Sequence, residues 1–255
     1  SFTLLQVSPP GTPPCMTTSL NKRTALHIFV DVLQPGVRAF HAYWRVILAF
    51  QFCGLIFVVG FYQLENVRDA AALVTTLQAQ GGVLFVALSN VVSGAVIPET
   101  VKLRFRAKVE APLTWKDFFF RCTLMGLGGI IVFYFYRFQE SLFCSNVDAL
   151  TLLKKILFDQ LVFSPFVGLP FIVIGFMLHE SNYQWKVFTR ELRLKNLCAR
   201  VIPLWATALS FWPIMLTLIY SLPGPLQFTL FLFASAAWSL IMVLLASKQW
   251  TQCSN

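Results

Sequence analysis

Charged residues are scarce in this chain: Asp, Glu, Lys and Arg make up 12% of its 255 residues, against about 25% in soluble domains. Acids are the scarcer group, with 11 against 20 basic residues, which gives a formal net charge of +9. So few charges cannot coat a water-exposed globule, whereas 57% hydrophobic residues and 26 Phe suit helices that face lipid. The composition therefore predicts an integral membrane protein.

Motifs for catalysis, metal binding and nucleic-acid recognition are also missing. No HExxH, GxSxG or paired-carboxylate arrangement occurs, so we expect a protein that is not an enzyme. The six cysteines form no CxxC pair and the three histidines do not cluster with them, which argues against a metal site or a disulfide framework. The basic residues form no platform with aromatic residues, so we expect no nucleic-acid partner.

The first 45 residues differ in composition from the rest. Residues 8–14, SPPGTPP, cannot form a helix or a central strand and are expected to be extended. Residues 1–45 carry four basic residues against one acid, which is typical of the neighbourhood of a mitochondrial import signal; a disordered basic tail is the alternative. A Pro-rich tail without a core is ordered only when it lies on something, and a partner subunit is one candidate.

Six apolar segments follow the tail. Hydropathy and length predict α-helical spans at 46–64, 83–97, 118–136, 156–178, 201–222 and 226–246. The Pro223-Gly224-Pro225 turn forces the last two into an antiparallel hairpin. We therefore expect an all-α, polytopic membrane helix bundle over residues 70–250, preceded by an extra N-terminal membrane helix at 46–64.

The basic residues are distributed unevenly about these spans. Of the 20 Lys and Arg, 15 fall on the side that holds the N-terminus, four fall on the opposite side, and Arg121 lies inside a span. Because positive loops stay on the cytoplasmic or matrix side, both termini are expected there. Two basic stretches on that side, 102–108 and 185–195, are either plain topology signals or interfacial helices that bind anionic lipid, cardiolipin if the membrane is mitochondrial. The candidate headgroup residues are Lys102, Arg104, Arg106, Lys108, Lys186, Arg190, Arg193 and Lys195.

The fourth span carries most of the unusual chemistry. Lys154 and Lys155 directly precede its apolar run, and an acid, Asp159, lies with Gln160 about one turn inside the run. Pro165 and Pro170 each remove a backbone donor that lipid cannot replace, so the span is expected to bend.

Arg121, Asp159 and Gln160 form the candidate intramembrane polar site. The alternative is anchoring at helix ends, with the long side chain of Arg121 reaching the interface. Arg121 and Asp159 enter the membrane from opposite sides, so we expect no direct ion pair between them. The small residues of the second, third and last spans are expected to serve close helix packing: Ser89, Ser93, Gly126, Gly128, Gly129, Ser235 and Ser239.

Three groups of residues occur in a characteristic order. The central group is Asp148, Lys154-Lys155, Asp159-Gln160 and Pro165; Arg121, Gly126 and Tyr136 precede it, and Trp212-Pro213, Pro223, Trp238 and Lys248 follow it. Residues 82–248 thereby resemble the Mpv-seventeen family, which includes the peroxisomal membrane protein of twenty-two kilodaltons. The resemblance implies a membrane helix bundle of the mitochondrial inner membrane or the peroxisome, and a channel or metabolite route.

Several polar positions of that family have changed here. Ser89-Asn90 stands where the family has a glycine–aspartate pair, and Leu216 and Ile219 replace a glutamine and an asparagine. We therefore expect a non-catalytic accessory subunit of a large mitochondrial inner-membrane assembly, such as a respiratory complex or ATP synthase. Its termini would lie in the matrix, its partners would be membrane lipids and neighbouring subunits, and it would have no cofactor besides phospholipid such as cardiolipin. The alternative hypothesis is a channel or small-metabolite pathway lined by Asp159, Gln160 and Arg121, and the alternative location is the peroxisomal membrane.

Overall fold

The computed structural model describes residues 44–45, 47–100, 114–143 and 148–253, and the side chains of these residues as far as residue 240. The Pro-rich segment and the basic stretch 102–108 lie outside these ranges. Within them the chain is helical without a strand, so the all-α prediction is confirmed.

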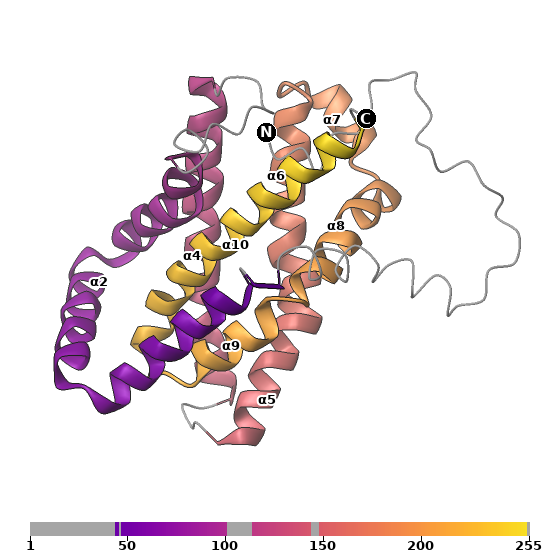
Figure 1. The fold of residues 1–255 in the computed structure, drawn as a ribbon. Helices are drawn as coiled ribbons and strands as arrows, with labels where there is room; N and C mark the ends of the chain where they lie inside the picture. The colour runs from indigo at the N-terminus through magenta and orange to yellow at the C-terminus, as the bar shows by residue number, and fades with distance from the viewer. Residues whose placement is uncertain (1–43, 46, 101–113, 144–147, 254–255) are drawn as a thin grey trace, which may run out of the picture.

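The helices form one bundle (Figure 1). In chain order the elements are a helix over Ile47–Gln63, α2 Glu65–Val91, the π-helical turn η2 Val92–Val96, α4 Trp115–Phe143, α5 Ala149–Phe158, the π-helix η3 Asp159–Gly168, α6 Leu169–Glu180, α7 Trp185–Glu191, α8 Leu194–Ala208, α9 Trp212–Tyr220 and α10 Gly224–Cys253.

Three continuous helical stretches are long and apolar enough to cross a membrane: Glu65–Thr100, Trp115–Phe143 and Ala149–Glu180. α8 and α9 meet the same requirement only as a pair bent by 64°. The helix Ile47–Gln63 is apolar but shorter, and the last expected span falls on α10. The described residues therefore give three spans, or four with the bent pair, and the count of six is not confirmed.

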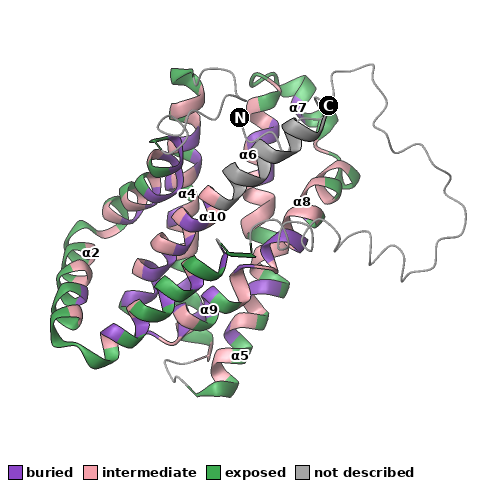
Figure 2. Ribbon diagram, viewed as in Figure 1, coloured by how far each residue is buried: buried purple, intermediate pink, exposed green. Residues whose placement is uncertain are grey.

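α2 breaks in its middle. Gly82 has φ 53° and ψ −137°, a conformation that strongly favours glycine, and a Cβ at this position would meet nothing within 4 Å. The backbone conformation therefore requires this glycine, while the space around it does not. The apolar segment expected to start at residue 83 begins directly after the break. Before it, residues 65–81 form an arm in which only Ala71 is buried, and Figure 2 shows this arm as largely exposed.

The long central helix begins at a cap. Asp148 Oδ1 accepts hydrogen bonds from the backbone N–H groups of Leu150 at 3.1 Å and Thr151 at 3.0 Å, as an N-cap residue does. A hydrogen bond from the Thr151 side chain, followed by the one from its backbone, lowers the pKa of the Asp148 carboxyl. α5 therefore starts at a defined residue outside the apolar run.

The same helix becomes π-helical where the sequence places its first proline. A π-helix is built on hydrogen bonds from a backbone N–H to the carbonyl five residues earlier, as Leu169 makes to Ser164 at the end of η3. Pro165 lacks this N–H and lies inside η3. The expected bend is therefore a change of helix type, which leaves the carbonyl of Gln160 without its donor within the helix.

The fifth expected span, 201–222, is not one straight helix. α8 ends at Ala208, and α9 starts at Trp212 with Pro213 in its first turn, where a missing N–H costs nothing. The 64° bend between the two helices corrects the prediction of a single span.

α9 lies at the centre of the largest apolar cluster. Its Met215, Leu216, Ile219 and Tyr220 are each at most 1% exposed, and they pack with buried residues of α4, α10 and the helix Ile47–Gln63. In a bilayer the lipid tails are as apolar as these side chains, so the cluster is stabilised by close packing rather than by exclusion of water. The expected α9–α10 hairpin is present, because the chain turns directly from Tyr220 into α10 at Gly224.

α2 and α4 approach closely through small residues, as the sequence predicts. A Cβ at Gly126 would lie 3.3 Å from Val91 Cγ2, and one at Gly129 would lie 2.5 Å from Asn90 Cβ. Gly128 faces away from this contact, where a Cβ would meet only Phe171 Cε1, at 3.6 Å. The packing role is therefore confirmed for Gly126 and Gly129.

We expect Gly129→Ala to destabilise the bundle, by about 1–3 kcal/mol, because the added methyl group overlaps the buried Asn90. The control is Gly128→Ala, one residue earlier, which makes an ordinary contact and should be neutral or slightly stabilising. Thermal unfolding of both variants in detergent measures the difference. Equal stability of the two would contradict the described α2–α4 contact.

Candidate functional site

A partly open cavity of about 200 Å³ lies between the helices of the bundle. α2, α4, η3, α6, α8, α9 and α10 all contribute to its lining, which is mainly apolar and aromatic. We call it the chamber. Its polar lining residues come from four of these elements and are Asn90, Tyr136, Asp159, Gln160, Ser164, Ser235 and Ser239.

Asp159 is the central polar residue of the chamber. Its side chain is held from two sides: the Tyr220 hydroxyl donates to Oδ2 at 2.7 Å, and Gln160 Nε2 donates to Oδ1 at 3.3 Å. Asp159 is 7% exposed and Tyr220 is 1% exposed. The ring of Tyr220 in turn packs edge to face against Tyr136, with centroids 5.5 Å apart. This hydrogen bond ties α9 to the start of the π-helix, in an environment where an unpaired carboxyl group is costly.

Gln160 connects η3 to α8 through its backbone carbonyl. Its carbonyl oxygen lacks a donor within η3 because Pro165 follows five residues later, and the indole Nε1 of Trp205 donates to it at 2.8 Å. Trp205 of α8 therefore supplies the hydrogen bond that the Gln160 carbonyl lacks because Pro165 has no N–H.

The side chain of Gln160 has unused hydrogen-bonding capacity. Its Oε1 is buried and has no hydrogen-bond partner among the described residues, and the residue is 4% exposed. Gln139 of α4 donates from Nε2 to the backbone carbonyl of Lys155 at 3.1 Å, outside the chamber. Three other buried side-chain atoms among the described residues also lack a partner, at Gln78, Gln139 and Thr229, and Gln160 is the one of the four that lines the chamber. Its Oε1 is therefore an open acceptor for a group in the chamber.

Asn90 closes the chamber on the α2 side. Its Nδ2 donates to the Met125 carbonyl at 2.5 Å, and the hydroxyl of Ser93 in η2 donates to the Asn90 carbonyl at 3.3 Å. These bonds hold Asn90 in the position against which Gly129 packs.

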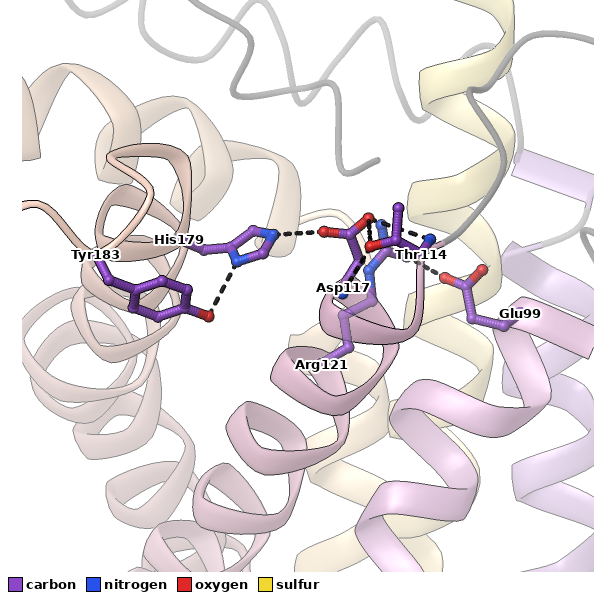
Figure 3. Close-up of polar contacts among 6 residues, drawn as sticks. All are labelled: Glu99, Thr114, Asp117, Arg121, His179 and Tyr183. Atoms are coloured by element: carbon purple, nitrogen blue, oxygen red, sulfur yellow. Dashed lines mark hydrogen bonds and ion pairs between the residues drawn. The ribbon is translucent and has the colours of Figure 1, made fainter.

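A second polar cluster lies where α4 begins and α6 ends (Figure 3). Thr114 and Asp117 cap α4 reciprocally: the Thr114 hydroxyl donates to Asp117 Oδ2 at 2.8 Å, and the Asp117 N–H donates to the Thr114 hydroxyl at 3.2 Å. His179 of α6 contacts Asp117 Oδ1 through Nε2 at 2.8 Å and the Tyr183 hydroxyl through Nδ1 at 3.1 Å. Its ring stacks on Phe120 at 4.2 Å. This cluster fixes the helix ends and does not line the chamber.

Arg121 belongs to the second cluster and not to the chamber. Its Nη1 forms an ion pair with Glu99, and the two side chains are 8% and 10% exposed. A buried arginine needs a partner, and the end of the preceding helix supplies one. Anchoring of Arg121 at the membrane interface stays a prediction. The proposed trio is divided, with Asp159 and Gln160 in the chamber and Arg121 outside it.

The predictions for the two basic stretches, 102–108 and 185–195, have different outcomes. Lys102, Arg104, Arg106 and Lys108 lie outside the described residues. The other four, Lys186, Arg190, Arg193 and Lys195, are exposed. They do not share one interfacial helix, because α7 ends at Glu191 and α8 starts at Leu194. Lipid binding by these residues stays a prediction.

The sequence did not reveal the partners of the central acid. Tyr220 and Trp205 are 61 and 45 residues away from the groups they contact, and each reads as an ordinary aromatic residue of an apolar span. Pro165 was the available signal, since a proline leaves a carbonyl of the preceding turn without its donor. In an α-helix that carbonyl would belong to Leu161, and the π geometry moves it to Gln160. Nothing in the sequence indicated which donor would fill it.

Comparison with other proteins adds no relative. A scan against protein-family models matches none, and searches of the curated proteins and of the solved structures find no match. Membership of the Mpv-seventeen family therefore stays a prediction from the motifs. Among the residues whose positions are described, no three His, Cys, Asp or Glu side chains gather as metal ligands would.

We expect Trp205→Phe to destabilise the chain by about 1–3 kcal/mol, because it leaves the Gln160 carbonyl buried without a donor. The matched control is Trp185→Phe, at an indole that is 68% exposed. Thermal unfolding in detergent compares the two variants with the parent chain. A loss in Trp205→Phe no larger than in the control would show that the indole hydrogen bond does not support the π-helix.

Proposed function

We propose that this chain is a non-catalytic integral membrane protein whose helix bundle receives a small solute in the chamber, as a channel or small-metabolite pathway of the Mpv-seventeen type. The observation that carries the proposal is the convergence of Asp159, Gln160 and polar side chains from three other helices on one cavity of about 200 Å³.

The membrane assignment is supported by the helices and their surfaces. Three or four helical units have the length and apolarity of spans. Large apolar side chains are widely exposed, among them Phe52, Leu84, Phe119 and Phe166. Such a surface is unusual in a soluble protein and suits contact with lipid.

A solute site accounts for the chamber better than packing alone does. Close packing normally fills space of this size, and an acid in an apolar span is costly and by default marks a functional site. Concave, mostly apolar sites with a few convergent polar groups are the usual form of small-molecule pockets. The sequence alone favoured an accessory subunit because its polar residues seemed too sparse for a pathway, and the chamber shows that they gather from distant positions.

The mitochondrial inner membrane, with the termini in the matrix, is the location we propose. The basic loops, the acid-poor first 45 residues and the family resemblance support it. The peroxisomal membrane is the alternative.

We expect the purified chain to conduct ions in planar bilayers bathed in potassium chloride, and Asp159→Ala to abolish the conductance by removing the chamber's carboxylate. The matched control is Asp69→Ala, at an exposed acid of the α2 arm, which should conduct like the parent chain. Single-channel recording measures all three proteins. Absence of conductance in the parent chain, or equal conductance of the parent chain and Asp159→Ala, would contradict a pathway through the chamber.

The second candidate function is the accessory subunit of a respiratory complex or of ATP synthase. The α2 arm favours it, because Leu73 and Leu77 are 61% and 45% exposed on a segment that buries only Ala71. Lipid or a neighbouring subunit would cover such a surface. The Pro-rich tail, which also suggested a partner, lies outside the described residues.

Blue-native electrophoresis of gently solubilised membranes separates the two functions. An accessory subunit migrates with respiratory or ATP-synthase markers in a band far above its own 28.9 kDa. Leu73→Asp, at the exposed face of the arm, should then reduce that band by several-fold. Migration of the parent chain near its own mass would exclude the accessory subunit, and the solute pathway would be the remaining candidate.

A further inference from the structure

The charge of the chamber lining has one sign. Among the described residues that line it, Asp159 is the only carboxylate, and no Lys, Arg or His takes part. The other titratable lining group is the Tyr136 phenol. Lys155 lies one turn before Asp159 on α5 but is not a lining residue. An anion placed in the chamber would therefore meet the carboxyl group of Asp159 and no basic side chain of the lining.

Asp159 and Gln160 offer free hydrogen-bond acceptors to the chamber. Asp159 accepts two hydrogen bonds from its protein neighbours, whereas a carboxylate offers about four acceptor sites. Gln160 Oε1, next to it, has no donor among the described residues. Two adjacent side chains can thus accept hydrogen bonds from one ligand head that carries several N–H donors.

The rest of the chamber matches the body of such a ligand. Trp212, Trp238, Phe163 and Phe171 contribute aromatic rings to the lining, and ring faces attract organic cations. A cavity of roughly 150 Å³ accepts a molecule the size of benzene. The 200 Å³ of the chamber therefore admits one ring with a short polar substituent.

We propose that the chamber binds a small organic ammonium ion, with its ammonium group between Asp159 and Gln160 and its apolar body against the aromatic rings. This inference rests on the proposed function, since it names the class of solute that the same chamber takes.

The chemistry ranks the alternatives. An ammonium ion brings a positive charge to the open acceptor sites of Asp159, and its N–H groups form charge-assisted hydrogen bonds there. A neutral alcohol of the same shape offers one donor and no charge, so it binds more weakly. A carboxylate of the same shape brings a like charge and does not bind.

Three probes of nearly one shape test this ranking: benzylammonium, benzyl alcohol and benzoate, titrated into the purified full chain in detergent and measured by calorimetry against empty micelles. We expect benzylammonium to bind about tenfold or more tightly than benzyl alcohol, and benzoate not to bind. Asp159→Asn should remove the preference for the cation. Asp69→Asn, the same substitution at the exposed acid of the α2 arm, should retain it.

The outcomes separate this inference from the function on which it rests. Equal or tighter binding of the alcohol or of benzoate overturns the inference and leaves a solute chamber in place. A cation preference that persists in Asp159→Asn overturns it as well, because the cation then binds elsewhere. If none of the three probes binds, the inference fails, and the pathway itself is decided by the conductance measurement. The comparison among probes on the parent chain needs no variant to fold.

Discussion

The missing N–H of Pro165 is the constraint on which the centre of this protein depends. In lipid no water can satisfy the carbonyl that loses its donor, so the protein must supply another. Here the helix changes to π geometry over Asp159–Gly168, which places the open carbonyl on Gln160, and Trp205 of α8 donates to it. The proline therefore fixes the contact between two helices as well as the bend.

The change of helix type also positions the polar side chain of Asp159 in the chamber. η3 starts at Asp159, and the carboxyl group of this residue receives the Tyr220 hydroxyl from α9. Tyr220 belongs to the largest apolar cluster, so this bond is part of the main packing of the bundle. One segment of ten residues is thus tied to α8 through its backbone and to α9 through its first side chain. A cavity persists between these ties because the helices are held at fixed positions around it.

The sequence predicted the fold to the level of helices and only part of the site. Asp159, Gln160 and Pro165 stand out in an apolar run, and Gly126 and Gly129 read correctly as packing residues, because these signals are local. Tyr220 and Trp205 do not stand out, because an aromatic residue in a span has no visible partner until the helices are packed. Arg121 falls in the same candidate site as Asp159 because both are charged residues of apolar spans, and its pairing with Glu99 becomes visible only when the helices are packed. The number of spans depends on the α8–α9 bend, which hydropathy does not detect.

Chemical access to the chamber tests the account most directly. The measurement is the labelling of single cysteines by methyl methanethiosulfonate, a small neutral reagent, in a chain whose six native cysteines are replaced by alanine. Gly128→Cys places a thiol on the chamber wall, and Ala234→Cys places one in the packed cluster outside it. The account predicts that Gly128→Cys reacts, that Ala234→Cys does not, and that benzylammonium slows the reaction. Absence of labelling at Gly128→Cys, or equal labelling at both positions, would contradict a chamber that receives solutes.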